Sequence, residues 1–325
     1  MPLRRKKSLS DQKTPPSWRE PGVYAGEDPD PQTQEQLRQL GFFWPGEMIP
    51  SIIRAPSDWS TAPIFCGTGT MLGGNLMLTA RHVLQDAFQD KDQFVYAAVW
   101  DSSEKLRVVN IRVLQYEVHP DPRCDLAIAR LAEWNARCPF GAFGYGSPLN
   151  EVFCAGYPED LAVGIQQGDF SALNNPRYLR GYITRALETD RDPIAPRPCF
   201  ELSFPLAPGM SGSPIWGYDQ ASKTRILLGI AIKSHFERLV VGEVTVHDSQ
   251  EREIGVERVA RLFEWGVAVR LSAVLTWEIE MLDGRPLHSL IPNPEATGEV
   301  PTYLRSGSEY WRSPSPDPWP DDNET

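Results

Sequence analysis

The sequence contains no apolar run long enough to span a membrane, and no apolar segment follows the basic cluster at residues 4–7. We therefore expect no membrane span, no signal peptide and a cytoplasmic location. Basic residues are outnumbered, because 32 Lys and Arg face 43 Asp and Glu for a formal net charge of −11. Since a basic surface supplies most of the affinity of nucleic-acid-binding proteins, this balance argues against nucleic acid as a partner.

Cysteine is scarce and irregularly placed. The five cysteines are Cys66, Cys124, Cys138, Cys154 and Cys199. No two of them form a CxxC pair, so we expect no structural zinc site, and nothing else in the sequence indicates a metal or another cofactor. Their odd number and wide spacing favour free, buried thiols in a reducing compartment.

Proline is abundant and concentrated at both ends, where periodic apolar patterning is also missing. We therefore interpret residues 1–45 and 284–325 as solvated tails flanking one domain at 46–283. Within that domain, short β-type runs alternate with Gly, Pro, Asn and Asp clusters, a pattern that favours a β-sandwich or barrel. Helical periodicity is best at 272–282 and weaker at 256–263.

Three segments carry residue types that catalysis uses, and each also has an ordinary structural reading. Pro208–Pro214 places Ser211 between glycines, which suits an exposed nucleophile but also an ordinary turn. His82 ends the run Leu78–His82, where a lone histidine is more often structural. Asp125 opens an apolar strand, a common place for a turn or cap residue. The conjunction of all three in the order His, Asp, Ser is much more specific than any one of them.

These segments resemble the signatures of trypsin-like serine peptidases. Thr79-Ala-Arg-His82 is similar to Thr-Ala-Ala-His, Asp125-Leu-Ala-Ile128 to the family's aspartate motif, and Gly209–Pro214 to Gly-Asp-Ser-Gly-Gly-Pro. The resemblance covers about residues 60–283 and is closest to bacterial members that lack disulfides. It implies an all-β fold of two packed six-stranded antiparallel Greek-key barrels, at about 60–140 and 150–270. It also implies a short C-terminal helix at about 271–283.

The resemblance also implies a role for each site residue. His82 would be the general base and then the general acid, Asp125 would orient the imidazole, and Ser211 would attack the scissile carbonyl. The backbone N–H groups of Gly209 and Ser211 would form the oxyanion hole. Strand Ile232–Ser234 would pair with the substrate backbone. The substrate-binding positions would be Pro205, Leu206, Ala207, Ala231, Ile232, Lys233, Ser234, Gly266 and Ala268.

The chain departs from the family pattern in ways that bear on control and specificity. Met210 replaces the aspartate that receives a freed N-terminus during zymogen activation, so we expect control by a loop, a partner or an inhibitor instead. Val83 stands where the half-cystine partner of Cys66 would be. Pro205 at the expected pocket floor offers no carboxylate for a basic substrate, which favours an uncharged, apolar P1 residue. Lys233 and His235 nearby leave an acidic P1 open.

Residues 236–265 form a long insertion between the two strands expected to line the pocket, and we expect it to act as a substrate or regulatory flap. Taken together, these features predict a serine endopeptidase with a protein or peptide substrate and a regulatory protein partner. Two alternatives remain open. One is a binding module with this fold in which the triad is never assembled, and the other is an esterase-like hydrolase that uses the same residues.

Overall fold

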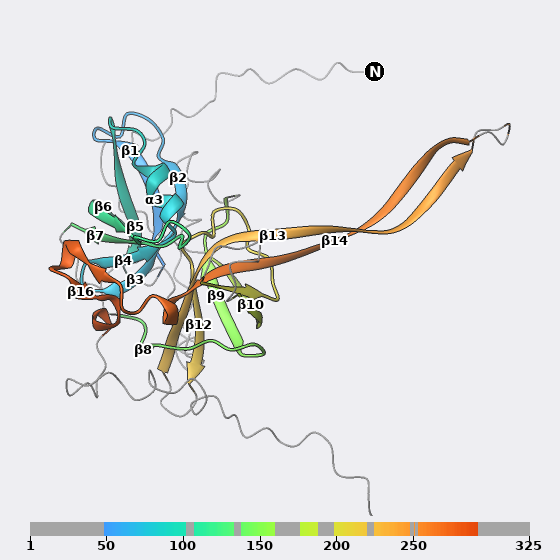
Figure 1. The fold of residues 1–325 in the computed structure, drawn as a ribbon. Helices are drawn as coiled ribbons and strands as arrows, with labels where there is room; N and C mark the ends of the chain where they lie inside the picture. Colours follow the sequence, from blue (N-terminus) through green and yellow to red (C-terminus); the bar gives the residue numbers. More distant parts are fainter. Residues whose placement is uncertain are drawn as a thin grey trace, which may run out of the picture.

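The computed structural model describes residues 49–101, 107–132, 138–159, 176–187, 198–219, 224–247, 250 and 253–291. Its body consists of two curled β-sheets packed together, from which one long hairpin projects (Figure 1). This confirms the expected two-barrel, mainly β class. Within the described residues, none of the helices has both the length and the apolar character that a bilayer crossing demands.

The first sheet has the strand order β2-β1-β5-β6-β7-β4-β3, with antiparallel neighbours throughout. Its strands are β1 (Ser51–Pro56), β2 (Ile64–Thr68), β3 (Thr70–Gly73), β4 (Leu76–Thr79), β5 (Gln93–Asp101), β6 (Arg107–Val118) and β7 (Ala127–Leu131). It has seven strands instead of the expected six because β2 and β3 are separated only by Gly69. The first barrel also begins earlier than the expected residue 60, at β1.

The second sheet has the order β12-β9-β10-β11-β14-β13-β8, and an additional pairing between β12 and β13 closes it. Its strands are β8 (Ala142–Phe143), β9 (Glu151–Gly156), β10 (Arg177–Leu187), β11 (Cys199–Leu202), β12 (Pro214–Asp219), β13 (Thr224–His247) and β14 (Glu253–Arg270). The seventh strand is β8, which adds two residues parallel to β13. In β10, buried Gly181, Ile183 and Leu187 alternate with exposed or half-buried residues, as a strand with one covered face requires.

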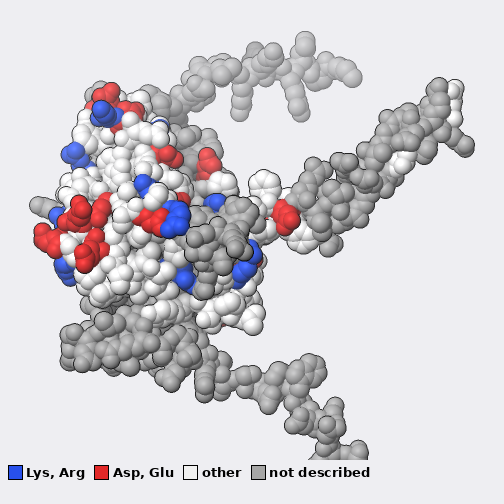
Figure 2. Space-filling view, in the orientation of Figure 1, with Lys and Arg blue, Asp and Glu red and all other residues white. Residues whose placement is uncertain are grey.

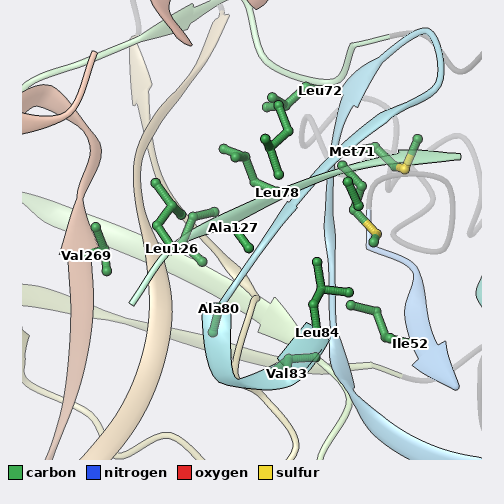
Figure 3. Close-up of a cluster of buried hydrophobic side chains, with 14 of the residues drawn as sticks. Ile52, Met71, Leu72, Leu78, Ala80, Val83, Leu84, Leu126, Ala127 and Val269 are labelled. Atoms are coloured by element: carbon green, nitrogen blue, oxygen red, sulfur yellow. The ribbon is translucent and has the colours of Figure 1, made fainter. Parts of the chain in front are cut away.

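The hydrophobic core joins the two barrels. One buried cluster contains Leu78 and Leu126 from the first barrel together with Val269 of β14 (Figure 3). Each fully buried side chain of this size stabilises the fold by roughly 1.5–3 kcal/mol relative to exposure. This shared core holds the barrels in a fixed relation, so residues contributed by each barrel can meet at their junction.

The segment after β14 differs from the helix expected at 271–283. It forms 3-10 helices η4 (Leu271–Ala273), η5 (Glu280–Leu282) and η6 (Leu287–Leu290), together with short strands β15 (Glu278–Ile279) and β16 (Arg285–Pro286). Left-handed Asp283 and Gly284 turn the chain back, with φ of 59° and 74°. The apolar residues are therefore buried by a small hairpin instead of by one helix face. Asp and Glu side chains gather on this end of the body (Figure 2).

One boundary and one element type differ from the sequence expectation. Leu287 is fully buried, so the packed domain continues to residue 291 instead of ending at 283. The weaker helix candidate at 256–263 is part of strand β14, and the 236–265 insertion is the projecting β13–β14 hairpin. The sequence expectation for 256–263 was wrong because its apolar spacing fits both periods over such a short run. The expected tails lie largely outside the described residues.

Candidate active site

Helix α3 (Arg81–Ala87) positions His82. Strand β4 ends at Thr79, Ala80 stays extended as the N-cap residue, and His82 follows in the first helical turn. The helix is anchored by Val83, Leu84 and Ala87, which are all buried. The His82 side chain remains 43% exposed at the surface of this packed turn.

Asp125 holds His82 through two hydrogen bonds. The His82 ring Nδ1 lies 2.7 Å from Asp125 Oδ2, and the His82 backbone N–H donates to Asp125 Oδ1 at 3.0 Å. One carboxylate therefore restrains both the ring and the helical turn that carries it. With Nδ1 donating to the carboxylate, the other ring nitrogen, Nε2, is left as a proton acceptor in the neutral imidazole.

The pKa values of this pair move in opposite directions. Burial disfavours the Asp125 carboxylate, but hydrogen bonds and charge from His82 outweigh it and lower the pKa of Asp125. Burial also disfavours the His82 imidazolium, yet the hydrogen bond and charge of Asp125 outweigh that effect and raise the pKa of His82 above 6.5. The carboxylate therefore stabilises a proton on the ring, which a general base requires once it has accepted one.

Ser211 lies in a turn that the first barrel holds in place. The Thr68 N–H donates to the Ser211 carbonyl at 2.8 Å, and the Thr68 hydroxyl donates to the Gly209 carbonyl at 2.9 Å. The Thr70 hydroxyl reaches the Gly212 carbonyl at 2.8 Å. Because β2 and β3 lead into β4 and α3, these bonds tie the serine turn to the elements that carry His82.

Contacts around Gly67 show how closely the turn that carries Ser211 approaches helix α3. A Cβ added at Gly67 would lie 2.8 Å from the Val83 side chain and 3.3 Å from the Ser211 carbonyl oxygen. Val83 follows His82 directly in α3. The turn that carries Ser211 is therefore packed, across Gly67, against the helix that carries His82.

Glycine is required at position 212 by both conformation and space. Its φ is +93°, and an added Cβ would lie 1.7 Å from the Thr68 carbonyl oxygen. On the far side of the turn, Gly212 N–H donates to Ala231 O at 2.7 Å and Ala231 N–H donates to Ser213 O at 2.8 Å. The serine turn is thus fastened to β13 as well as to the first barrel.

The orientation of the Pro208–Gly209 peptide decides where the Gly209 N–H points. The Pro208 carbonyl accepts a hydrogen bond from Glu159 N–H at 2.6 Å. In a trans peptide the C=O and N–H point in opposite directions, so the Gly209 N–H faces away from Glu159. Among the described residues, neither the Gly209 nor the Ser211 N–H has an acceptor in the hydrogen-bond network.

The Ser211 hydroxyl is directed at β13. It donates to the Ile232 carbonyl oxygen at 2.8 Å. A hydroxyl has only one proton to donate, so in this structure that proton is not directed at the imidazole. Ile232 begins the strand Ile232–Ser234, which the resemblance assigns to pairing with the substrate backbone.

Neither Met210 nor the three cysteines Cys66, Cys124 and Cys199 supplies a charged group at neutral pH. Met210 is fully buried in the apolar core of the second barrel, so no charged group occupies the position before the serine. Burial raises the pKa of Cys66 to about 11 and those of Cys124 and Cys199 to about 12. All five cysteines are free, as expected, and these three stay protonated at neutral pH.

The expected substrate-binding residues separate into buried and accessible sets. Leu206, Ala231 and Ala268 belong to the core of the second barrel, Ile232 and Gly266 are also buried, and Ala207 and Ser234 are half-buried. Pro205 and Lys233 are exposed. Leu206 packs against Gly266, where an added Cβ would lie 2.9 Å from Leu206 Cγ, and Leu206 N–H donates to Ser234 Oγ at 2.6 Å.

The sequence interpretation assigned no role to Thr68, Thr70 or Glu159. The two threonines alternate with glycines in Gly67–Thr70. Buried threonines beside glycines indicate hydroxyls that need an acceptor close by. That signal could have identified them as anchors, but not their partners.

Comparison with known proteins finds one matching family model. A family model for the trypsin-like peptidase domain matches residues 67–222, a range that includes His82, Asp125 and Ser211. No curated protein matches the chain. Among solved structures, an HtrA-type protease with a tripeptide matches at a TM-score of 0.41 and 14% identity, over 71% of this chain and 59% of that chain. Residues 67–222 are therefore similar to the trypsin-like peptidase domain, in keeping with the two-barrel architecture.

Proposed function

We propose that the chain is a serine endopeptidase that works through an acyl-enzyme intermediate. The observation that carries this proposal is the pair of hydrogen bonds by which Asp125 holds the His82 ring and backbone. In the proposed reaction, Ser211 Oγ forms a bond to the scissile carbonyl carbon while its proton passes to His82 Nε2. His82 then gives that proton to the leaving amine, and water hydrolyses the ester by the same route.

The oxyanion of the tetrahedral intermediate would be stabilised by the Gly209 and Ser211 N–H groups. The turning of the Pro208 carbonyl toward Glu159 supports this role, because it leaves the Gly209 N–H available. Such donors need no reorganisation when charge develops. Loss of one donor of this kind costs about 10²–10³ in kcat.

Substrate binding would itself release the nucleophile. The Ile232 carbonyl that now accepts the Ser211 hydroxyl is the acceptor we assign to the P1 N–H of a substrate strand. When that N–H takes the carbonyl, the hydroxyl loses its partner and can turn to His82 Nε2. In the proposed enzyme, the same strand therefore binds the substrate and frees the serine.

The P1 residue would be small and uncharged. Leu206 packs against Gly266, and Ala231 and Ala268 lie in the same apolar core, so these four positions offer little depth and no charge. Control would not use a freed N-terminus, because Met210 is buried among apolar residues. We propose a loop or a protein partner as the regulator instead.

Labelling with a fluorophosphonate probe tests the proposal. We expect the wild type to label and Ser211→Ala to lose labelling, whereas Ser213→Ala, the same change two residues away, keeps it. If the wild type does not label, the catalytic proposal fails. The alternative of a non-catalytic binding module is then preferred. The hydrogen bond from the Ser211 hydroxyl to the Ile232 carbonyl favours it, because that bond directs the hydroxyl proton away from His82. Labelling without cleavage of any peptide in a diverse pool would favour an esterase.

A further inference from the structure

The inner edge of β13 runs through the candidate active site. From Thr224 to Ile230 this edge pairs with β12, and Ala231 then exchanges hydrogen bonds with Gly212 and Ser213. The next acceptor on the edge, the Ile232 carbonyl, holds the Ser211 hydroxyl. Among the described residues, none pairs with this edge beyond Ile232, although β13 continues to His247.

The opposite edge of β13 is fully used. It pairs with β14 from Gly229 to His247, and the register is regular between Lys233↔Val267 and Val240↔Ala260. Successive residues of a strand direct their N–H and C=O groups to alternate edges. Ala231 faces the serine turn and pairs with Ala268, so the next pair after the irregularity at Ile232, Lys233↔Val267, directs its backbone groups between β13 and β14. The backbones of Ser234, Phe236, Arg238 and Val240 therefore face the serine side. From Ile232 to Val240 this edge is about 27 Å long at the usual rise per residue.

We propose that this edge of β13, from Ser234 to Val240, is an extended binding site for the N-terminal side of an unstructured polypeptide substrate. The proposal rests on the proposed function, which places P1 beside Ile232. On an antiparallel strand, P3 then lies beside Ser234. An antiparallel strand in that register brings P5 beside Phe236, P7 beside Arg238 and P9 beside Val240. Continuity with the serine edge is what selects a substrate strand as the occupant.

Side chains at the base of the hairpin add selectivity. Phe236 is 66% exposed, and Leu262 on the same face is 62% exposed. A residue opposite Phe236 has its Cβ about 4.5–5.5 Å from that of Phe236, close enough for ring contact. We therefore expect an apolar or aromatic residue to be favoured at P5.

The low stability expected of an isolated two-stranded hairpin also favours the addition of a third strand. A two-stranded hairpin alone in water is at best marginally stable. Three strands with an apolar face can be stable on their own. The base is stiffened on its other face, where the rings of His235 and Trp265 lie 4.9 Å apart. Beyond this base the hairpin projects away from the body (Figure 1). A substrate strand would therefore gain main-chain hydrogen bonds while ordering the arm that holds it.

Substrate length gives the first test. Two quenched fluorescent peptides would share the sequence from P4 to P4′, and one would extend to P9 with Phe at P5. We expect kcat/KM to be about tenfold higher for the long peptide, since each net hydrogen bond contributes about 0.5–1.5 kcal/mol. N-methylation at P5, whose N–H faces β13, should remove most of this gain. N-methylation at P6, whose N–H faces away, is the matched control and should remove little.

Substitutions on the protein give the second test. Phe236→Ala should lower kcat/KM for the long peptide about fivefold or more and leave the short peptide unchanged. Phe263→Ala is the matched control, because Phe263 is 43% exposed on the same hairpin but lies on β14, away from the proposed edge. Equal rates for both peptide lengths, or equal effects of the two substitutions, would overturn the proposal.

Two further outcomes are distinguishable. If Phe236→Ala reduces the mass measured by sedimentation and slows both peptides equally, the arm binds a second copy of the chain and the proposal is wrong. If neither peptide is cleaved, the proposed function fails by itself. Fluorescence anisotropy of labelled peptides with the Ser211→Ala protein then tests the β13 edge separately. The proposed edge predicts about tenfold tighter binding of the long peptide, and equal Kd values for the two peptides would refute it.

Discussion

Thr68 connects the two barrels at the candidate active site, and replacing it with valine isolates that connection. The side chain is fully buried. Its hydroxyl donates to the Gly209 carbonyl at 2.9 Å and accepts from the Tyr157 N–H at 3.1 Å. Valine has nearly the same shape but can do neither, so Thr68→Val leaves two backbone groups at the barrel junction without this partner.

The size of the effect follows from those two groups. A buried polar group that loses its hydrogen bond costs about 1–2 kcal/mol, so Thr68→Val should lower the free energy of unfolding by about 2–4 kcal/mol. Thr70→Val is the matched control, because Thr70 is equally buried but its hydroxyl makes one such bond, to the Gly212 carbonyl. It should cost about half as much, about 1–2 kcal/mol.

Urea unfolding followed by tryptophan fluorescence measures both values, since the chain has 10 tryptophans. Thr68→Val should also lower kcat more than Thr70→Val does, because it frees the Gly209 carbonyl beside the proposed oxyanion donor. If Thr68→Val loses less than about 1 kcal/mol, or no more than Thr70→Val, the inter-barrel role assigned to this hydroxyl is refuted.

Two other predictions follow from the same site. Gly212→Ala should lower the free energy of unfolding by more than about 3 kcal/mol or prevent folding, because its φ is +93° and the new Cβ would lie 1.7 Å from the Thr68 carbonyl; normal unfolding in urea would contradict this. The proposed base must be neutral to act, so kcat/KM should rise with pH through a midpoint above 6.5, because Asp125 raises the pKa of His82. Asp125→Asn should move that midpoint down and lower kcat about 10⁴-fold; an unmoved midpoint would mean that His82 is not the titrating group.

The fold class was readable from the sequence because it depends on local patterns. Short alternating runs between turn residues predict strands wherever they occur, and the resemblance of the His, Asp and Ser motifs to those of trypsin-like peptidases implied two barrels. The errors fell where local pattern is ambiguous. Apolar residues at 271–291 are buried by η4, η5, η6 and the β15–β16 pair, because Asp283 and Gly284 reverse the chain. A helix face and a compact hairpin bury similar sequences.

The sequence by itself determined the chemical identities at the candidate site: a histidine, an aspartate and a serine in order, a methionine before the serine and five cysteines without a zinc pattern. Only the tertiary structure decided how these groups are held. Thr68 and Gly209 are separated by 141 residues, and the Ser211 hydroxyl meets Ile232 across a turn and a strand. Whether residues 236–265 form a loop or a paired hairpin was likewise settled by register. Such contacts depend on how two barrels pack, and packing brings together backbone groups that no local sequence pattern records.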